Sequence, residues 1–357
     1  MKIYWEKHLI RDPPELYIKS RQEEETKMWR KSYYAARGRG HKEKGIPCQD
    51  KVWYRSSCGA QVVALADGAG SARWSHYGAE ETVKRITRQL AAHFEEFYAC
   101  EDAYEVSRRI LGEIRKGLRR LAAKRKCRVE DLASTLLAVA VKDDRFLMIH
   151  LGDGAIGYLK NGIVRTASRP TNGEYVNSTV FTTSSSAARL MTLCKGPANE
   201  IDGFILMSDG TGDSLYNRKA KEVSHLAYPL FLYSGIFEGE GIVGFLENTF
   251  ADVFTQVTRD DCSLAILVRD SAYHDIKALR MEDKMALYGL DRFQPGTRRR
   301  IKQYEAILEL LADGKGEQET ARTLYIRKEH FKRKLRHLED CGLLRKEGKS
   351  LRLLTAK

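Results

Sequence analysis

The sequence predicts an α/β protein in which antiparallel sheets and helices form layers, followed by a small helical domain. Four apolar segments succeed one another with only a few residues between them, at residues 135–141, 145–151, 155–159 and 163–167. Connections this short join antiparallel strands, because a parallel pair needs a crossover of a dozen residues or more. Helical patterns stand before and after these strands, so helices are expected to cover the sheets.

Two long helices are expected at residues 78–98 and 103–124. In the first, Val83, Ile86 and Leu90 recur at intervals of three or four residues, which places them on one face of a helix. Both segments are therefore predicted to cover a sheet.

The later part of this region is expected to alternate between loop, strand and helix. Segment 170–202 is rich in Ser, Thr and Asn and has little apolar periodicity, so it is interpreted as a loop or flap. Strands are expected at 203–208 and 263–268, with an amphipathic helix at 239–257 between them.

Composition narrows the class of protein. The 357 residues suffice for one large domain and a smaller one. Seven cysteines, an odd number without a Cys-x-x-Cys pair, indicate neither a disulfide framework nor a zinc ribbon, and we expect a reducing cytoplasm. No apolar stretch suits a signal peptide or a membrane span, so no membrane partner is expected.

Acidic residues stand at the ends of four predicted strands. The apolar run 62–66 leads into Asp67-Gly68, and two later strands end in Asp153-Gly154 and Asp209-Gly210. Asp260 and Asp261 stand immediately before the closing strand.

Asp-Gly after a strand is also the commonest hairpin signal, and a single such pair would favour that interpretation. The recurrence indicates instead that the acids converge. Hard cations such as Mg2+ and Mn2+ prefer oxygen ligands, mostly carboxylates, carbonyls and water. The pattern therefore predicts a site for such a cation.

The order of these motifs resembles the metal-dependent protein phosphatases of type 2C. The segments concerned are CQD at 48–50, ALADGAGSA at 64–72, STLLAVAV at 134–141, HLGDGAIG at 150–157, MSDGTGD at 207–213 and DDCSLAIL at 260–267. Gly38, His41 and the Cys48–Asp50 start resemble the bacterial branch. The resemblance covers about two thirds of the chain, and it sharpens the expected fold to a helix-sheet-sheet-helix sandwich with two antiparallel sheets.

The resemblance implies a site for two Mn2+ or Mg2+ ions with a possible third. Asp67 would bridge two ions, the backbone carbonyl of Gly68 would help hold one of them, and Asp209 and Asp260 would complete the other. Asp50 would reach one metal through water. Asp153 would help hold the third, weaker ion, although a simple turn aspartate fits this position nearly as well.

Two positions depart from many eukaryotic members of that family. The resemblance places a proton-donating His and a phosphate-gripping Arg where this chain has Ala69 and Gly45. His41 is the candidate proton donor in their place, although a single loop histidine is more often an ordinary surface residue. The candidate phosphate contacts on the same loop are Arg37, Arg39, Lys42 and Lys44.

The C-terminal part carries a concentrated positive charge. Residues 297–357 contain 17 Lys and Arg against nine Asp and Glu, a net +8 out of +13 for the chain. Three helical patterns at 301–312, 318–324 and 328–340 and a hairpin around 346–349 resemble a winged helix, a variant of the helix-turn-helix. This leaves two partners open, duplex DNA and a protein. The candidate DNA contacts are Lys328, Lys332, Arg333, Lys334, Arg336 and Lys346.

The sequence thus predicts an N-terminal extension at 1–30, a phosphatase-like domain at 31–270, a helical connector at 271–296 and a winged-helix-like domain at 297–357. Two functions remain open. The first is a cytoplasmic Mn2+- or Mg2+-dependent phosphatase that acts on phosphoserine and phosphothreonine in proteins. The second is a DNA-binding or scaffold protein whose phosphatase-like domain senses phosphorylated partners with little or no turnover.

Overall fold

The computed structural model describes residues 29–170, 179–237, 239–269, 276, 279–290, 292–347 and 350–353. Contacts divide the chain into two units, which are described separately: a large unit of residues 22–231 and 246–269, and a small unit of residues 1–21, 232–245 and 270–357. Most of the expected N-terminal extension lies outside the described residues, as does part of the expected connector.

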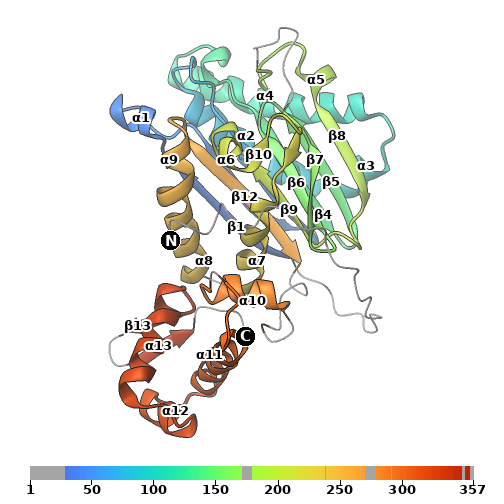
Figure 1. Cartoon of the computed structure of the whole chain (residues 1–357). Helices are drawn as coiled ribbons and strands as arrows, with labels where there is room; N and C mark the ends of the chain where they lie inside the picture. Colours follow the sequence, from blue (N-terminus) through green and yellow to red (C-terminus); the bar gives the residue numbers. More distant parts are fainter. Residues whose placement is uncertain are drawn as a thin grey trace. The chain divides into compact units, whose positions relative to one another are not determined.

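The large unit contains two five-stranded sheets in which every pairing is antiparallel (Figure 1). The first sheet has the order β2 (Lys51–Ser57), β3 (Ala60–Ala66), β4 (Leu136–Lys142), β5 (Arg145–Leu151) and β8 (Thr192–Pro197). The second has the order β1 (Trp29–Ala36), β12 (Cys262–Arg269), β9 (Gly203–Met207), β6 (Ala155–Lys160) and β7 (Ile163–Ser168). The predicted fold class is confirmed.

The central strands are buried on both faces, which explains why their sequences are continuously apolar. In β3, Val63 and Leu65 pack into the core between the two sheets, together with Phe204 of β9. Val62 and Ala64, which alternate with them, face the helices on the other side of the first sheet.

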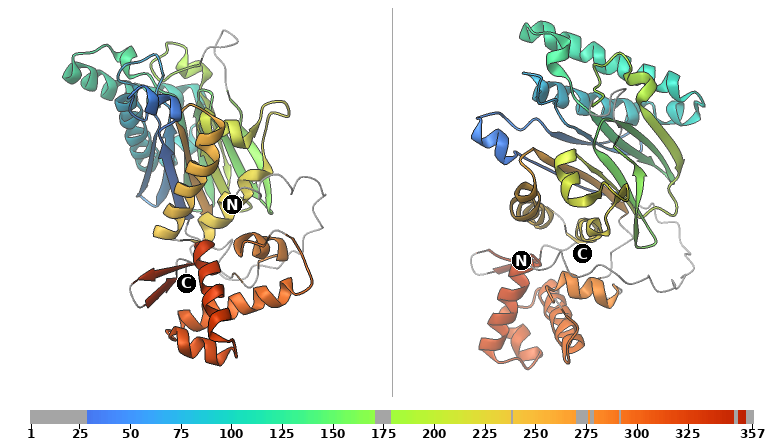
Figure 2. Two further views of the ribbon diagram at one scale, coloured as in Figure 1. Left: turned by 60° about the vertical axis from the view of Figure 1, so that its left-hand side comes forward. Right: turned by 45° about the horizontal axis from the view of Figure 1, so that its top comes forward.

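Helices α2 (Ser75–Ala92) and α4 (Ala103–Arg125) cover the outer face of the first sheet (Figure 2). The expected helix at 78–98 starts three residues earlier and is broken at His93, after which the short helix α3 (Phe94–Ala99) begins. The outer face of the second sheet contacts a π-helical turn, η3 (Phe250–Phe254), where Phe250 packs on Tyr34 of β1. The turn continues helix α8 (Glu240–Thr249) and leads into α9 (Thr255–Val257).

One strand in the expected flap was not predicted. The segment 170–202 contains α5 (Ala187–Leu190) and the edge strand β8, which pairs with β5; residues 171–178 lie outside the described part. An edge strand exposes much of its surface, so β8 carries Lys195, Gly196 and Pro197 where a core strand would be apolar. The interpretation of the whole segment as a loop was therefore wrong at this strand.

The chain between β9 and α8 forms short elements at the end of the sheets, for which the sequence carried no clear pattern. They are α6 (Asp209–Leu215), β10 (Tyr216–Asn217), β11 (Glu222–Val223), η2 (His225–Ala227) and α7 (Tyr228–Ile236). The N-terminal part of α7 packs on the second sheet, because a Cβ at Gly203 would meet the Phe231 ring at 2.7 Å.

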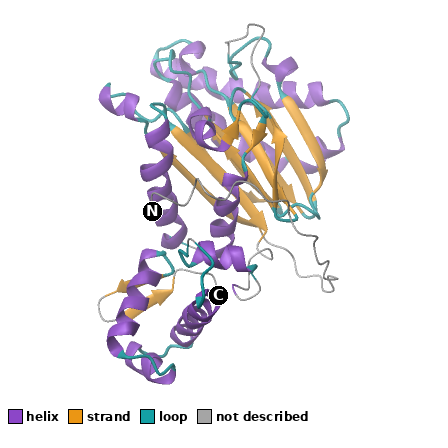
Figure 3. Cartoon of the chain, in the orientation of Figure 1, coloured by secondary structure: helices purple, strands orange, loops and turns teal. Residues whose placement is uncertain are grey.

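The small unit contains helices and one hairpin (Figure 3). Its described elements are α10 (Met281–Leu287), α11 (Thr297–Ala312), α12 (Glu317–Thr323), α13 (Lys328–Asp340), β13 (Leu344–Glu347) and β14 (Ser350–Leu353). Ile301 and Ile307 of α11 and Leu335 and Leu338 of α13 are buried. Three helices and a hairpin thus occur in the expected order, and their identity as a winged helix stays a prediction. Residues 348–349 of the turn lie outside the described part.

None of the described helices combines the length and the apolar character that crossing a bilayer requires.

Candidate active site

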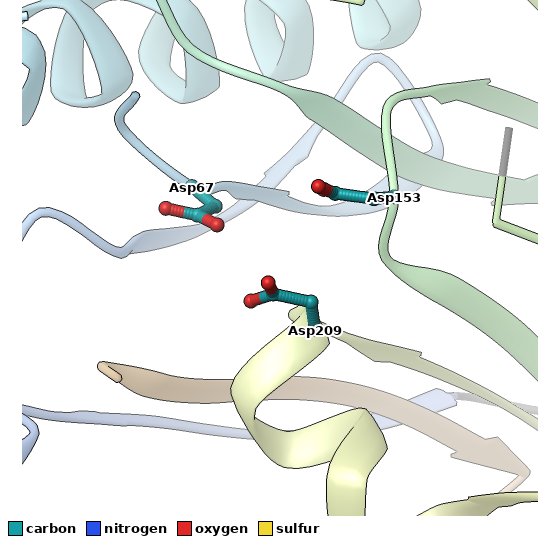
Figure 4. A group of neighbouring side chains, drawn as sticks. All are labelled: Asp67, Asp153 and Asp209. Atoms are coloured by element: carbon teal, nitrogen blue, oxygen red, sulfur yellow. The ribbon is translucent and has the colours of Figure 1, made fainter. Parts of the chain in front are cut away.

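Three aspartates from separate strands converge at one edge of the sheets. Asp67 follows β3, Asp153 follows β5 and Asp209 follows β9, and one carboxylate oxygen from each lies within 4.8 Å of the other two (Figure 4). The topology explains the convergence, because β3 and β5 are both antiparallel to β4 and therefore end at the same edge.

The three carboxylates create an environment that disfavours negative charge. Burial, followed by repulsion from Asp50, Asp209 and Asp153, holds the pKa of Asp67 well above its usual range. Burial and the charges of Asp153 and Asp260 raise the pKa of Asp209 to about 7. A cation bound among these groups would remove the repulsion and favour their ionised forms.

Asp50 lies at the same site and is 2% exposed. Its pKa is raised to about 6, chiefly by burial. The hydroxyls of Ser208 and Ser263 are close enough to lower this pKa, yet no described group meets either carboxylate oxygen in hydrogen-bond geometry. A buried carboxylate without a partner is costly. The position therefore fits the role of accepting hydrogen bonds from metal-bound water, as does the unpartnered Oδ1 of Asp153.

Gly68 occupies a position that only glycine fits. A Cβ there would lie 2.8 Å from the Cβ of Ser75, at the start of α2. The backbone of the Asp67-Gly68 turn is also paired with the start of β4, since the N–H of Thr135 donates to the carbonyl of Asp67 at 2.8 Å. The turn is thus rigidly placed beside the three carboxylates.

Asp260 differs from the other predicted ligands because it is exposed and lies outside the group of three. Its Oδ1 accepts the backbone N–H of Asp261 at 2.8 Å, and its charge contributes to the raised pKa of Asp209. It is therefore near the site, and its role as a ligand stays a prediction.

The neighbouring Asp261 is a residue whose role the sequence reasoning missed. It is 2% exposed, and its two oxygens accept the backbone N–H of Gly38 at 2.7 Å and that of Gln49 at 2.5 Å. The Gln49 side chain donates to Ser75 Oγ at 2.6 Å. Asp261 thereby ties the loop between β1 and β2 to the start of β12. Two consecutive acids before a buried strand were the available signal.

His41 also contacts Asp261. It lies on the short helix α1 (Arg39–Glu43), half-buried, with Nδ1 2.9 Å from Asp261 Oδ2. The distance is that of an ion pair, although the approach is not aligned as a directed hydrogen bond. The loop therefore holds this imidazole against a buried carboxylate, which the sequence alone did not indicate.

The predicted phosphate contacts differ in whether their charged groups are already bonded to the protein. Arg39 donates to the carbonyls of Gln256 at 3.1 Å and Thr258 at 3.4 Å, so its guanidinium is engaged with the backbone. Arg37 and Lys44 are exposed. A further cation, Arg218, is bonded to Asp213 at 2.9 Å, and Asp209 and Asp153 also help to raise its pKa.

These features coincide with one protein family. The model of the family "Protein phosphatase 2C" matches residues 37–235, more than half of the chain. The chain belongs to the protein phosphatase 2C family. The predicted resemblance is confirmed. No curated protein matches the sequence.

The solved structures that match this chain include phosphatases of low sequence identity. The serine/threonine phosphatase of Staphylococcus aureus is 15% identical, with a TM-score of 0.48 over 70% of this chain and 99% of that one. That of S. agalactiae is 14% identical, with a TM-score of 0.46 over 68% and 99%. The catalytic domain of the phosphatase PstP, in complex with two manganese ions, is 17% identical, with a TM-score of 0.44 over 68% and 99%.

In this protein phosphatase 2C, a buried histidine supports the Asp153 turn. His150 is fully buried, with Nδ1 2.5 Å from Ser168 Oγ and Nε2 3.0 Å from the carbonyl of Gly152. Burial lowers the pKa of His150 to about 4. The ring is therefore neutral, so Nε2 donates to Gly152 and Nδ1 accepts from Ser168. Gly152 has a φ of 120°, which favours glycine.

Proposed function

We propose that this chain is a metal-dependent protein phosphatase that hydrolyses phosphoserine and phosphothreonine with a metal-activated water. The observation that carries the proposal is the convergence of Asp67, Asp153 and Asp209 at the edge of the two sheets. Family membership supports the same reaction, because the family is that of the type 2C protein phosphatases.

The donor set fits Mn2+ or Mg2+, since it consists of oxygen ligands without a thiolate or imidazole cluster. Asp67, Asp209, Asp260 and the carbonyl of Gly68 would hold two ions, Asp50 would bind through water, and Asp153 would serve a third. Bound ions supply a nucleophilic water at neutral pH and offset the charge of the phosphate.

The remaining residues have separate tasks. His41 protonates the departing alcohol, and Asp261 holds its ring in place through the contact at 2.9 Å. Arg37, Arg39 and Lys44 are the proposed phosphate contacts, on the same loop.

Metal dependence is the first test. Excess chelator is expected to abolish hydrolysis of a generic phosphoester, and Mn2+ or Mg2+ is expected to restore it, because the water is a poor nucleophile without a bound cation. The assay compares initial rates before chelation, after it and after readdition of metal. Full activity in excess chelator would contradict the proposal. No activity in the untreated protein or after addition of Mn2+ or Mg2+ would favour the alternative of a sensing domain.

A second test concerns His41. His41→Ala is expected to slow hydrolysis of a phosphoserine peptide much more than that of p-nitrophenyl phosphate, because only the alkoxide of serine needs a proton in order to leave. About 10²–10⁴-fold on the peptide is typical of a general acid. Exposed His330 supplies the control substitution, which should leave both rates unchanged. Equal losses on both substrates would remove His41 from proton donation.

We further propose that the small unit binds duplex DNA. The observation in favour is the α12–α13 pair, in which Lys328, Lys332 and Arg336 recur every four residues on the exposed face of α13. Arg333 is exposed as well, whereas Lys334 is half-buried with Nζ 5.1 Å from the Tyr304 ring centre. The side chain of Lys346 lies outside the described part.

The test replaces Lys328, Lys332 and Arg336 with alanine in the full chain. Binding of a labelled duplex is expected to weaken, and the slope of log affinity against log salt is expected to fall by up to about 3, one for each lost phosphate contact. An unchanged slope would leave a protein as the partner of this unit.

A further inference from the structure

A second concentration of positive charge lies on helix α4 and the turn that follows it. Residues 103–128 contain ten Lys and Arg and two Glu, a net charge of +8. The C-terminal 61 residues carry the same net charge, so the other 270 residues sum to −3. The basic character of the chain therefore resides in two segments.

The two faces of α4 have opposite character. Val106, Ile110, Ile114 and Leu118 are fully buried in the core with α2 and the first sheet. The opposite, exposed face carries basic residues from Arg108 to Lys124, a distance of about 24 Å along the helix.

Acids neutralise only the N-terminal half of this face. Arg109 pairs with Glu96 at 2.7 Å, and Lys116 pairs with Glu113 at 2.5 Å. Further along the helix, four exposed cations form no ion pair with an acid among the described residues, although the charge of Arg120 acts on Glu113, which is paired with Lys116. We call them the α4 cationic surface: Arg119, Arg120, Lys124 and Lys126.

Stabilisation of the helix explains the presence of only two of these four cations. Cations in the last turn interact favourably with the helix dipole, which explains Lys124 and the C-capping Lys126. Arg119 and Arg120 lie before that turn, where the dipole effect has faded. Like charges at neighbouring positions of a helix repel one another, as Arg119 and Arg115 do, and no ion pair among the described residues offsets that cost at Arg119 or Arg120.

We propose that the α4 cationic surface binds the phosphate backbone of nucleic acid without reading its sequence. Phosphate contacts require only cations that follow the backbone, and Arg120 and Lys124 are four residues apart on the helix, about 6 Å of helix rise. A groove of about 580 Å³ between α2 and α4 is lined by the exposed Arg88 and by Lys116, which is one turn of α4 before Arg119 and Arg120.

Two other partners fit the surface less well. A membrane-surface helix needs an exposed apolar face, but the apolar face of α4 is buried in the core. Protein interfaces rely on aromatic or apolar anchors, and Tyr104, at the far end, is the large hydrophobic residue that α4 exposes within the described part. Nucleic acid needs neither feature.

The test uses the full chain and a labelled DNA duplex of arbitrary sequence, with binding measured by fluorescence anisotropy over a range of salt concentrations. Arg119→Ala/Arg120→Ala is expected to weaken binding and to lower the salt slope by about 2, one unit for each lost contact. Lys160→Ala/Arg165→Ala removes two charges from the β6–β7 hairpin as a matched control and should leave the slope unchanged.

Two further arms make the result decisive. In the background of the α13 triple variant, residual duplex binding should persist and should be removed by Arg119→Ala/Arg120→Ala. Loss of all binding in the α13 variant alone would overturn the proposal, as would an unchanged slope in the α4 variant. If poly-glutamate displaces the duplex at equal charge concentration, the partner of the α4 cationic surface is an acidic protein and the proposal of nucleic acid is wrong. Unaltered hydrolysis of a small phosphoester by the α4 variant verifies its fold and keeps this test separate from that of the phosphatase activity.

Discussion

Replacing Asp67 with asparagine is expected to abolish turnover and, at the same time, to stabilise the metal-free protein. The carboxylate of Asp67 lies within 4.8 Å of those of Asp153 and Asp209, and burial together with these charges raises its pKa. Removing one charge relieves the repulsion, which we expect to contribute about 1–3 kcal/mol at neutral pH. Asparagine is a weaker ligand, so metal binding and hydrolysis are lost together.

The raised pKa values of the buried aspartates also predict how the stability of the metal-free protein depends on pH. Asp50 and Asp209 have folded pKa values of about 6 and about 7, above the ordinary value of 3.8. The folded state therefore holds protons that the unfolded chain releases, so stability is fully present below about pH 4 and is lost as the pH rises through 6 and 7. In chelator, the melting temperature should fall across this window, and Mn2+ should counteract the fall.

Thermal unfolding with and without Mn2+ measures both effects. The Asp67→Asn variant should melt above the wild type in chelator at neutral pH, depend less on pH, and gain little from Mn2+. Asp252→Asn, an exposed acid on the π-helical turn, supplies the control and should behave as the wild type. A variant that melts below the wild type in chelator, or that retains full turnover, would contradict the assignment of Asp67.

The sequence predicted the parts of the fold that burial dictates. Strands β3, β4 and β9 are buried on both faces, so their apolar runs and terminal Asp-Gly pairs could be recognised without the structure. Strand β8 could not, because an edge strand needs no apolar pattern in order to pair with β5.

The sequence also predicted only part of the candidate site. Strand ends predicted which acids converge, but the sequence carries no signal that separates the exposed Asp260 from the buried Asp261. The net charge of +13 likewise gave no sign of the segment at α4, because a net charge does not say where along the chain the cations lie. Contacts between residues more than 200 positions apart, such as Gly38 with Asp261, become visible only in the structure.

Substitution of Asp261 by alanine is expected to destabilise the protein far more than the same change at Asp260. Asp261→Ala leaves the buried backbone N–H groups of Gly38 and Gln49 without their acceptor, at a cost of about 1–3 kcal/mol each. It also releases His41 and frees the loop that carries Asp50. Asp260 is exposed and accepts only the N–H of its neighbour, so Asp260→Ala should leave the folded state almost as stable as before.

Urea unfolding and Mn2+ titration of the two variants separate these roles. Asp260→Ala should lose Mn2+ affinity and turnover with little change in the free energy of unfolding, whereas Asp261→Ala should lose about 2–6 kcal/mol of it. Asp261→Asn keeps one oxygen acceptor and should recover part of that stability, but its neutral amide no longer gives the His41 ring a carboxylate to rest against. Its hydrolysis of a phosphoserine peptide should therefore remain impaired relative to p-nitrophenyl phosphate. If Asp260→Ala proves as destabilising as Asp261→Ala, the carboxylate of Asp261 does not anchor the loop. If Asp261→Asn restores the peptide rate fully, that carboxylate does not act through His41.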